Sequence, residues 1–455
     1  MGTTIVPAML IFGGIGVTGF ALYVVALCVI PLAVVWRPIL ALYLLVPLLP
    51  LQTLRYQLQV LPFGDKFVDL LLVAAIVGYL MNRSDDAPAV DQRLKKYALF
   101  YCGFLFVMLW YGSFVLHLPW PLSPSNDRLA DWKNMVEMPI LFILVTNLVR
   151  TRRQMVTLLA LMMLTVLRAN IGFFHTVSGR DFTHFSNNLR YAGVLGYAGQ
   201  NGLAAFMAEF TVILLAIAPA AKQWWFRALI YASVVMSAYC VVFSFSRGGY
   251  VGVLVGLAVL GLLRDRHYLI VLVILLATWQ TLLPNAVRER ITMTYDGEQV
   301  ESSANERLEL WQDAFTIIPE HPVLGTGFVT YRYLGRSADY LDTHNFYVKV
   351  IVETGFVGLV LFLVLLWVFV REGWALFLNS EDPLFQRLGL GVCAMIACVA
   401  AVNLFGDRWM YQQITGYMWT FLGLAARARA MQAEPDPSEE VLSGPHAASL
   451  QEQAV

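Results

Sequence analysis

Long apolar runs separated by short polar connections dominate the sequence. A helix needs about 20 apolar residues to cross a bilayer, whereas barrel strands are short and alternate polar with apolar positions. The continuous runs therefore predict an all-α fold, a polytopic transmembrane bundle of about 12–13 helices. They fall near residues 8–36, 38–50, 67–81, 97–118, 134–149, 155–174, 198–219, 224–246, 248–263, 267–283, 346–370, 385–405 and 409–426.

One long polar segment, residues 284–345, interrupts this pattern and divides the chain. Residues 1–283 are expected to form a transmembrane bundle, and residues 346–429 the C-terminal transmembrane helices. The tail, residues 430–455, contains Pro, Ser and Glu and almost no aromatic residue, so it is expected to be a disordered cytoplasmic extension.

An amphipathic helix is predicted inside the long polar segment. Ser303 and Glu306 have the spacing of a capping box, and apolar residues follow at helical intervals until Pro319. Such a helix lies on the membrane surface or packs against the bundle, and the plainer alternative is that it only caps the transmembrane core. The apolar positions are Leu308, Trp311, Phe315 and Ile318.

Composition agrees with a membrane protein, because 58% of the 455 residues are hydrophobic and 14% are charged. The net charge of +0 gives no sign of a nucleic-acid partner. The five cysteines lie in apolar runs without metal-ligand spacing, so neither a disulfide framework nor a metal site is expected. Short loops rich in Lys and Arg stay cytoplasmic, and by alternation the outward segments are 51–66, 119–133, 175–197, 284–345 and 406–408.

Ser246-Arg247-Gly248-Gly249 joins two apolar runs without a hydrophilic linker. Gly248, Gly252 and Gly256 recur every four residues, a spacing that favours close helix packing. Arg247 would begin this helix at its positive end, where an anion such as a lipid phosphate is stabilised. The alternative is that Arg247 only extends to lipid headgroups.

Two more arginines stand out upstream. Arg190 precedes the 198–219 run, whose helix Asn201 would cap. Arg168 lies inside an apolar run, where an ionisable residue marks a polar cavity or, alternatively, pairs structurally with Glu209.

The polar segment ends in Asp342-Thr343-His344-Asn345, directly before the next apolar run. This position puts an imidazole at a membrane boundary, where it could accept a proton near neutral pH. The alternative is a helix cap beside Asp342 and Asn345. Just beyond, Lys349 and Glu353 are four residues apart and could pair with each other.

Three separated motifs together resemble the O-antigen ligase and O-antigen polymerase superfamily of bacterial membrane glycosyltransferases. The resemblance covers roughly residues 185–365, and its order and long outer loop fit that family. The motifs are Ser246-Arg247-Gly248-Gly249, His321-Pro322-Val323-Leu324-Gly325-Thr326-Gly327 and His344-Asn345-Phe346-Tyr347 with the following Glu353-Thr354-Gly355.

The resemblance implies an inverting glycosyltransferase in the bacterial inner membrane that needs no metal or cofactor. Its donor would be an undecaprenyl-pyrophosphate-linked glycan, used on the periplasmic side, so the long loop would be periplasmic. Arg190 and Arg247 would hold the pyrophosphate, and His344 would activate or orient the acceptor hydroxyl. Possible supporting residues are Arg168, Asn201, Asn345 and Tyr347.

Several functions remain open on the sequence. A ligase would transfer the glycan to a lipid A–core acceptor, whereas a polymerase would extend a growing O-antigen or exopolysaccharide. A protein-directed oligosaccharyltransferase is a third variant. A transporter or flippase for lipid-linked glycans is the alternative of another class, although the polar residues gather at the outer rim rather than at a midplane site.

Overall fold

The computed structural model describes residues 16–82, 92–123, 125–293, 295–296, 299–300, 302–334 and 343–433. Within these residues the chain is almost entirely helical, with one two-stranded antiparallel hairpin, so the predicted all-α class is confirmed. The helices are α2 (Val17–Val35), α3 (Ile39–Leu48), α4 (Gln52–Leu58), α5 (Phe67–Met81), α6 (Gln92–Val115), α7 (Asp127–Leu148), α8 (Arg152–Val177), α9 (Gly199–Ile217), α10 (Trp224–Phe243), α11 (Arg247–Leu263), α12 (His267–Leu282), α13 (Asn285–Thr292), α14 (Ser302–Ile317), α15 (Phe346–Asn379), α16 (Pro383–Val402) and α17 (Gln412–Ala433), and the strands are β1 (Tyr295–Asp296) and β2 (Gln299–Val300).

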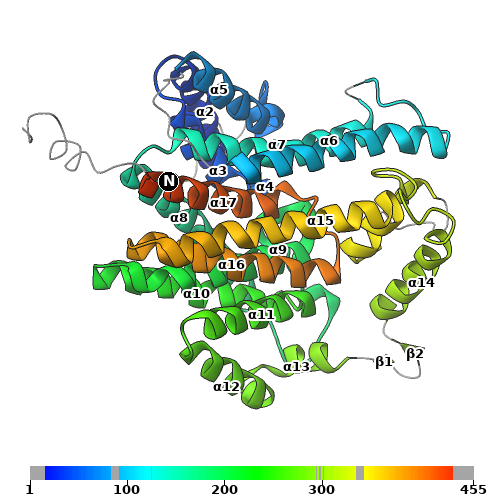
Figure 1. Ribbon diagram of the computed structural model, residues 1–455. Helices are drawn as coiled ribbons and strands as arrows, with labels where there is room; N and C mark the ends of the chain where they lie inside the picture. Colours follow the sequence, from blue (N-terminus) through cyan, green and yellow to red (C-terminus); the bar gives the residue numbers. More distant parts are fainter. Residues whose placement is uncertain are drawn as a thin grey trace, which may run out of the picture.

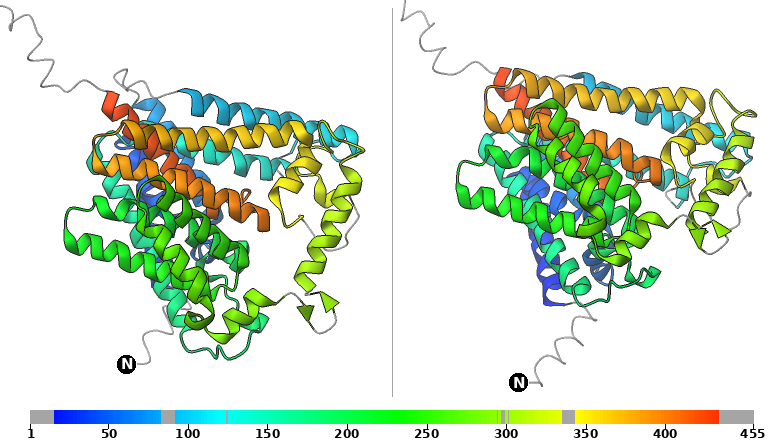
Figure 2. Two further views of the ribbon diagram at one scale, coloured as in Figure 1. Left: turned by 60° about the horizontal axis from the view of Figure 1, so that its bottom comes forward. Right: turned by 90° about the horizontal axis from the view of Figure 1, so that it is seen from below.

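The long helices form one bundle with roughly parallel axes, and α14 and the hairpin lie at one end of it (Figure 1; Figure 2). Among the described residues, seven helices are long and apolar enough to cross a membrane, or up to nine if each of two bent helix pairs is one span. This is fewer than the 12–13 helices expected to span, because several predicted runs form shorter helices. The 10 residues of α3 and the 15 of α5 are examples.

The five segments predicted to face outward meet at one end of the bundle, here called the outer end. Residues 51–66 contact residues 175–197, since the Tyr197 backbone N–H donates to Gln52 Oε1 at 2.9 Å. Residues 175–197 contact the long loop, since the Ala286 N–H donates to the Phe182 carbonyl at 3.1 Å. Segment 119–133 reaches the same loop through an ion pair of Asp131 with Arg332.

The opposite end, here called the inner end, carries the predicted basic clusters. Arg152 at the start of α8 pairs with Asp382 at 3.1 Å, and Arg429 near the end of α17 pairs with Glu372 at 2.6 Å. The helix α8 joins the two ends, and its 26 residues span about 39 Å, enough to cross a bilayer.

The glycines of α11 pack as predicted. A Cβ on Gly252 would lie 2.6 Å from Val402 Cγ1 of α16, and one on Gly256 would lie 2.2 Å from Val212 Cγ2 of α9. No side chain larger than hydrogen fits at these positions without movement, so the glycines allow α11 to pack directly against α9 and α16.

The helix α15 is broken at Gly355, which has a φ of 65° and a ψ of −170°. The loop 321–327 supplies the hydrogen bonds that the break removes. The N–H groups of Phe356 and Val357 donate to the carbonyls of Pro322 and Val323, and the N–H groups of Thr326 and Gly327 donate to the carbonyls of Val352 and Glu353. Broken backbone at membrane depth is stable only when protein groups satisfy it in this way.

Gly327 shows how closely this loop approaches its neighbours. Its φ is +111°, and a Cβ there would lie 2.2 Å from the Cα of Gly112 on α6. The glycines of the turn and its tight backbone contacts thus fix the loop between α6 and α15.

Two boundaries differ from the sequence prediction, and a third lies outside the described residues. The helix α17 continues to Ala433, so residues 430–433 are helical rather than part of a disordered tail, and the remainder of that tail lies outside the described residues. The helix α15 continues to Asn379, beyond the predicted end at 370. The first predicted run begins at 8, but only its part from residue 16 onward lies within the described residues.

The amphipathic helix of the outer loop exists as α14. Its buried face consists of Leu310, Ala314 and Ile317, against which Trp311 and Ile318 pack, whereas Phe315 is 58% exposed. The side chains of the proposed capping box at 303–306 lie outside the described residues. All five cysteines are free in the structure.

Candidate active site at the outer end

The N-termini of three helices meet at the outer end. The helix α11 packs next to the start of α9, where a Cβ on Gly249 would lie 2.7 Å from Ala204 Cβ. A Cβ on Gly248 would lie 2.8 Å from Phe405 Cβ, at the end of α16, and Tyr347 of α15 donates to the Ala400 carbonyl of α16 at 2.8 Å. Three positive helix ends close together favour a bound anion.

Arg190 lies beside the start of α9. Its Nη2 donates to Asn201 Oδ1 at 2.8 Å. The prediction that Asn201 caps this helix is wrong, because the helix begins at Gly199 and its N-cap, Ala198, makes no side-chain cap. The structure thus brings two predicted site residues into contact. The Asn201 side chain accepts from the Arg190 guanidinium and does not cap a backbone N–H of the helix.

Arg247 begins α11 as predicted, and its Nη1 donates to the Met293 carbonyl at 3.0 Å. A further arginine, Arg290 on α13, reaches the same residue, with its Nη1 3.7 Å from the Met293 sulfur. Tyr250, one turn along α11, packs against the same buried cluster as Leu189, next to Arg190, and Ile291, next to Arg290. We call Arg190, Arg247 and Arg290 the arginine cluster.

The sequence interpretation did not single out Arg290. Its side chain is 5% exposed, lies over the Phe185 ring at 5.0 Å and donates through Nε to the Phe245 carbonyl at 3.4 Å. The signal was present in α13, where Ala286, Val287 and Arg290 occupy one buried helix face. An arginine on the apolar face of a short helix is the pattern that would have identified it.

His344 lies at the start of α15 and is half-buried. Asn345, not His344, caps this helix, because its Oδ1 accepts from the N–H groups of Tyr347 and Val348 at 3.0 and 3.3 Å. The Trp311 indole of α14 donates to the Thr343 carbonyl at 3.0 Å, which ties the outer-loop helix to the residue before the histidine. The capping alternative for His344 is therefore removed.

Backbone strain accompanies the motifs. Phe245, Val329 and His344 have φ values of 55°, 55° and 51°, in the left-handed region that non-glycine residues avoid. Each such residue costs about 1–3 kcal/mol and persists only where its surroundings enforce it. Of the five non-glycine residues with positive φ among the described residues, Phe245 lies two residues before Arg247 and His344 is the motif histidine, whereas Phe63 and His117 lie outside both motifs.

A polar cavity of about 240 Å³ opens beside the start of α15. Lys349 and Asp407 form an ion pair of 2.6 Å in its wall. Its further lining includes Asp131, Arg332, Tyr197, Tyr411, Gln412 and Glu353. Carboxylates, amides and tyrosines can bind the hydroxyl groups of a sugar through hydrogen bonds, so this cavity is chemically suited to part of a glycan.

Lys349 and Glu353, which were predicted to pair with each other, have other partners. Lys349 pairs with Asp407, and the buried Glu353 carboxylate accepts from the N–H groups of Val329 and Tyr331 at 3.1 and 3.2 Å. Glu353 thereby fixes the strained turn at Val329. Asp407 was not singled out, although it lies in the three-residue polar break at 406–408.

Arg168 is not joined to the cluster by the contacts of the described residues. It is exposed on α8, nine residues before the helix end and so about 14 Å from it, and its guanidinium lies along the helix toward Gly172. Glu209 is buried, with 5% exposure, so the alternative pairing of these two residues is not formed. Tyr347 uses its hydroxyl group to bind α16.

A comparison with known protein families supports the resemblance stated for the sequence. Residues 232–363 match the family model for O-antigen ligase. The resemblance to the O-antigen ligase and polymerase superfamily is thereby confirmed. No curated protein matches the chain.

The matched O-antigen ligase segment contains Arg247, Arg290, the loop 321–327 and His344, whereas Arg190 and Asp407 lie outside it. The match supports a glycosyltransferase-like enzyme of the O-antigen ligase or polymerase type, which uses a lipid-linked glycan and a polysaccharide acceptor. Together with the candidate spans, it indicates a multi-pass membrane protein of polysaccharide biosynthesis.

Proposed function

We propose that this protein is a periplasm-facing glycan ligase of the bacterial inner membrane. It transfers a glycan from undecaprenyl pyrophosphate to a hydroxyl group of a lipid A–core acceptor. The observation that supports this most directly is the arginine cluster beside three helix N-termini, at the end of the bundle that also carries His344.

Transfer replaces one bond at the anomeric carbon of the first sugar. The acceptor oxygen forms a bond to that carbon, the bond from the carbon to the pyrophosphate oxygen breaks, and the pyrophosphate leaves with the electron pair. Attack from the face opposite the leaving group inverts the anomeric configuration. The acceptor proton passes to His344, whose imidazole suits a base at neutral pH.

The arginine cluster would bind the pyrophosphate and stabilise the charge that develops on it. Guanidinium groups stay protonated and bind phosphate through paired hydrogen bonds. Met293 and Asn201 orient three of the nitrogen atoms before the substrate arrives, and such preorganised charges stabilise a transition state more than water can. No metal ion enters this mechanism.

The test is product size from purified protein in detergent, with an undecaprenyl-pyrophosphate-linked glycan supplied with or without lipid A–core. A ligase gives one discrete shift that requires the lipid acceptor. A ladder formed from donor alone would instead establish the polymerase, and carrier lipid crossing vesicle membranes without product would establish the transporter.

Replacing the proposed base tests the mechanism in the same assay. His344→Ala is expected to lower turnover about 100-fold or more, the usual contribution of general base catalysis. His321→Ala is the matched control, because His321 belongs to the turn whose backbone, rather than its imidazole, contacts the rest of the loop. Full activity of His344→Ala would contradict the proposed role.

A further inference from the structure

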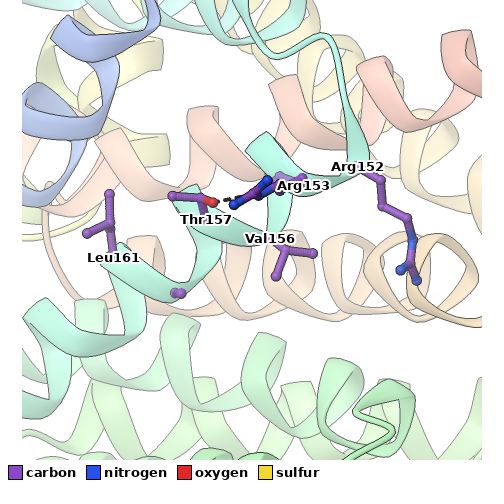
Figure 3. A pocket seen from close by; sticks show the side chains of 6 residues that line it. Arg152, Arg153, Val156, Thr157 and Leu161 are labelled. Carbon is purple, nitrogen blue, oxygen red and sulfur yellow. Dashed lines mark hydrogen bonds between the residues drawn. The ribbon is translucent and has the colours of Figure 1, made fainter.

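The inner end contains two adjoining cavities that the proposed reaction does not use. The first is a shallow, open hollow along the first three turns of α8, lined by Arg152, Arg153, Val156, Thr157, Ala160 and Leu161 (Figure 3). The second, about 230 Å³, shares Arg152, Val156 and Ala160 with it and continues between α8, α9 and α10. We call the two together the inner-end groove.

The walls of the groove are apolar and its mouth is basic. Leu159 and Met163 of α8, Ile217 of α9 and Phe226 and Ile230 of α10 line the second cavity. Its mouth carries Arg152 and Lys222, and Arg153 lies beside Thr157 at the mouth of the first (Figure 3). An apolar cleft that opens between basic side chains fits a molecule with an apolar chain and an anionic head.

The charges at the mouth differ in what they already bind. Arg152 is held by Asp382 of the α16 N-terminus. Arg153 and Lys222 have no ion pair with any of the described residues and are both exposed. Arg153 at the first cavity and Lys222 at the second thus remain available to an external anion, and basic residues near a membrane surface attract anionic lipids.

We propose that the inner-end groove binds an anionic diacyl phospholipid, with its phosphate near the basic residues that line the groove, Arg152, Arg153 and Lys222, and an acyl chain between α8 and α10. Along α8, Arg153 at the basic end of the groove is about 36 Å from Val177, which leads into the outer loop that carries Arg190, so the headgroup of this lipid is separate from the pyrophosphate of the glycan carrier. Short basic loops favour the cytoplasmic side, where the headgroups of anionic phospholipids are accessible.

The experiment uses the full-length protein in detergent and measures the shift in unfolding temperature caused by added phosphatidylglycerol or by phosphatidylcholine with the same chains. We expect phosphatidylglycerol to raise the unfolding temperature of the wild type by several degrees more than phosphatidylcholine does. The variant Arg153→Gln/Lys222→Gln is expected to lose this difference, because only the lipid charge distinguishes the two additives.

The matched control is Arg266→Gln/Arg371→Gln, which removes the same charge from the inner end outside the groove. It should keep the full difference between the lipids. If both double variants lost the difference between the lipids equally, the attraction would be a general property of the surface and the proposed site would be wrong. The site would also be wrong if both lipids raised the unfolding temperature of the wild type equally. Stronger stabilisation by undecaprenyl phosphate, abolished by Arg153→Gln/Lys222→Gln, would overturn the diacyl assignment.

Discussion

At the scale of single residues, the outer end combines fixed positive charge with an imidazole. Arg190, Arg247 and Arg290 come from three separate parts of the chain, yet hydrogen bonds or a shared neighbour place each of them at the outer end. Asn201 and Met293 orient their guanidinium groups. These side chains therefore lose little conformational freedom when an anion binds. This preorganisation is what a phosphate site requires.

Arg290 provides the sharpest residue-level prediction. Arg290→Lys keeps the charge but removes the paired donors that a phosphate accepts, so kcat/KM is expected to fall about 10- to 100-fold, the equivalent of one or two charge-assisted hydrogen bonds. Kinetics with the lipid-linked donor measure this. Arg288→Lys on the same helix is the control, because Arg288 faces the surface and donates to the Gln280 carbonyl.

A purely structural role for Arg290 predicts a different result. Since its Nε also donates to the Phe245 carbonyl, loss of that contact would lower the unfolding temperature and the activity together. An unchanged unfolding temperature with a raised KM for the donor assigns the side chain to the anion. Unchanged kinetics in Arg290→Lys would remove Arg290 from the site.

The sequence predicted the position of a residue correctly where the residue belongs to a local motif. It did not predict the partner of a residue where that partner comes from a distant segment. Arg247 begins its helix as expected. Lys349, by contrast, pairs with Asp407 at 2.6 Å rather than with its helical neighbour Glu353. Helical spacing shows which residues can meet along one helix, but Asp407 approaches from the connection between α16 and α17, and no spacing rule predicts that approach.

At the scale of elements, glycine contacts determine how closely α11 approaches its neighbours. Gly252→Ala places a methyl group 2.6 Å from Val402 and 3.0 Å from the Cys398 sulfur. Overpacking of this kind costs about 1–3 kcal/mol, so the unfolding temperature and the activity should both fall, because Arg247 moves with α11.

Gly103→Ala on α6 is the matched control for that variant. No atom lies within 4 Å of a Cβ built on Gly103, so the added methyl group should be neutral or slightly stabilising through helix propensity. Thermal unfolding in detergent compares the two variants. Equal unfolding temperatures would show that α11 can move without cost.

A second element-scale prediction concerns the contact between the loop before Arg190 and α13. Glu289 accepts a hydrogen bond from the Phe185 N–H at 2.7 Å and lies 3.0 Å from the His184 imidazole. The backbone hydrogen bond from Phe185, helped by His184, lowers the pKa of Glu289 below its ordinary value of 4.5.

A carboxylate with a lowered pKa stabilises the folded state above its unfolded pKa and loses that contribution as pH falls through the folded value. Protection of the Phe185 amide from hydrogen exchange, corrected for the intrinsic rate, should therefore persist from pH 7 to pH 4.5 and decline below it. Glu289→Gln should weaken protection throughout, whereas the exposed Glu320→Gln should not. Loss of protection already at pH 6 would contradict this assignment.

The elements themselves were predictable where apolar periodicity is long, and the breaks were not. The amphipathic helix α14 lies where its pattern placed it. The break of α15 at Gly355 was not predicted, because an isolated glycine in an apolar run is ordinarily tolerated within a helix. It becomes a break here since the loop 321–327 supplies four backbone hydrogen bonds across it, a long-range contact that local sequence does not encode.

At the scale of the whole molecule, the two ends of the helix bundle differ in their polar groups. The helices separate an outer end with the arginine cluster, His344 and the polar cavity from an inner end with the basic mouth of the inner-end groove. Alternating loops and basic clusters predicted which segments share an end of the bundle, because charge placement depends on topology rather than on packing. The side of the membrane that each end faces stays a prediction. The sequence did not predict the cavity, whose lining residues come from five segments.

The proposed function requires the outer end to face the periplasm, and this can be measured directly. Single cysteines introduced at Thr183 of the outer end and at Arg266 of the inner end occupy exposed positions, in a background with the exposed Cys28 replaced by serine. In intact cells with a permeabilised outer membrane, an impermeant maleimide should label Thr183→Cys but label Arg266→Cys only after the inner membrane is lysed. The reverse pattern would place the arginine cluster and His344 in the cytoplasm, away from a glycan carried on the periplasmic face, and the ligase proposal would then be wrong even if the family assignment holds.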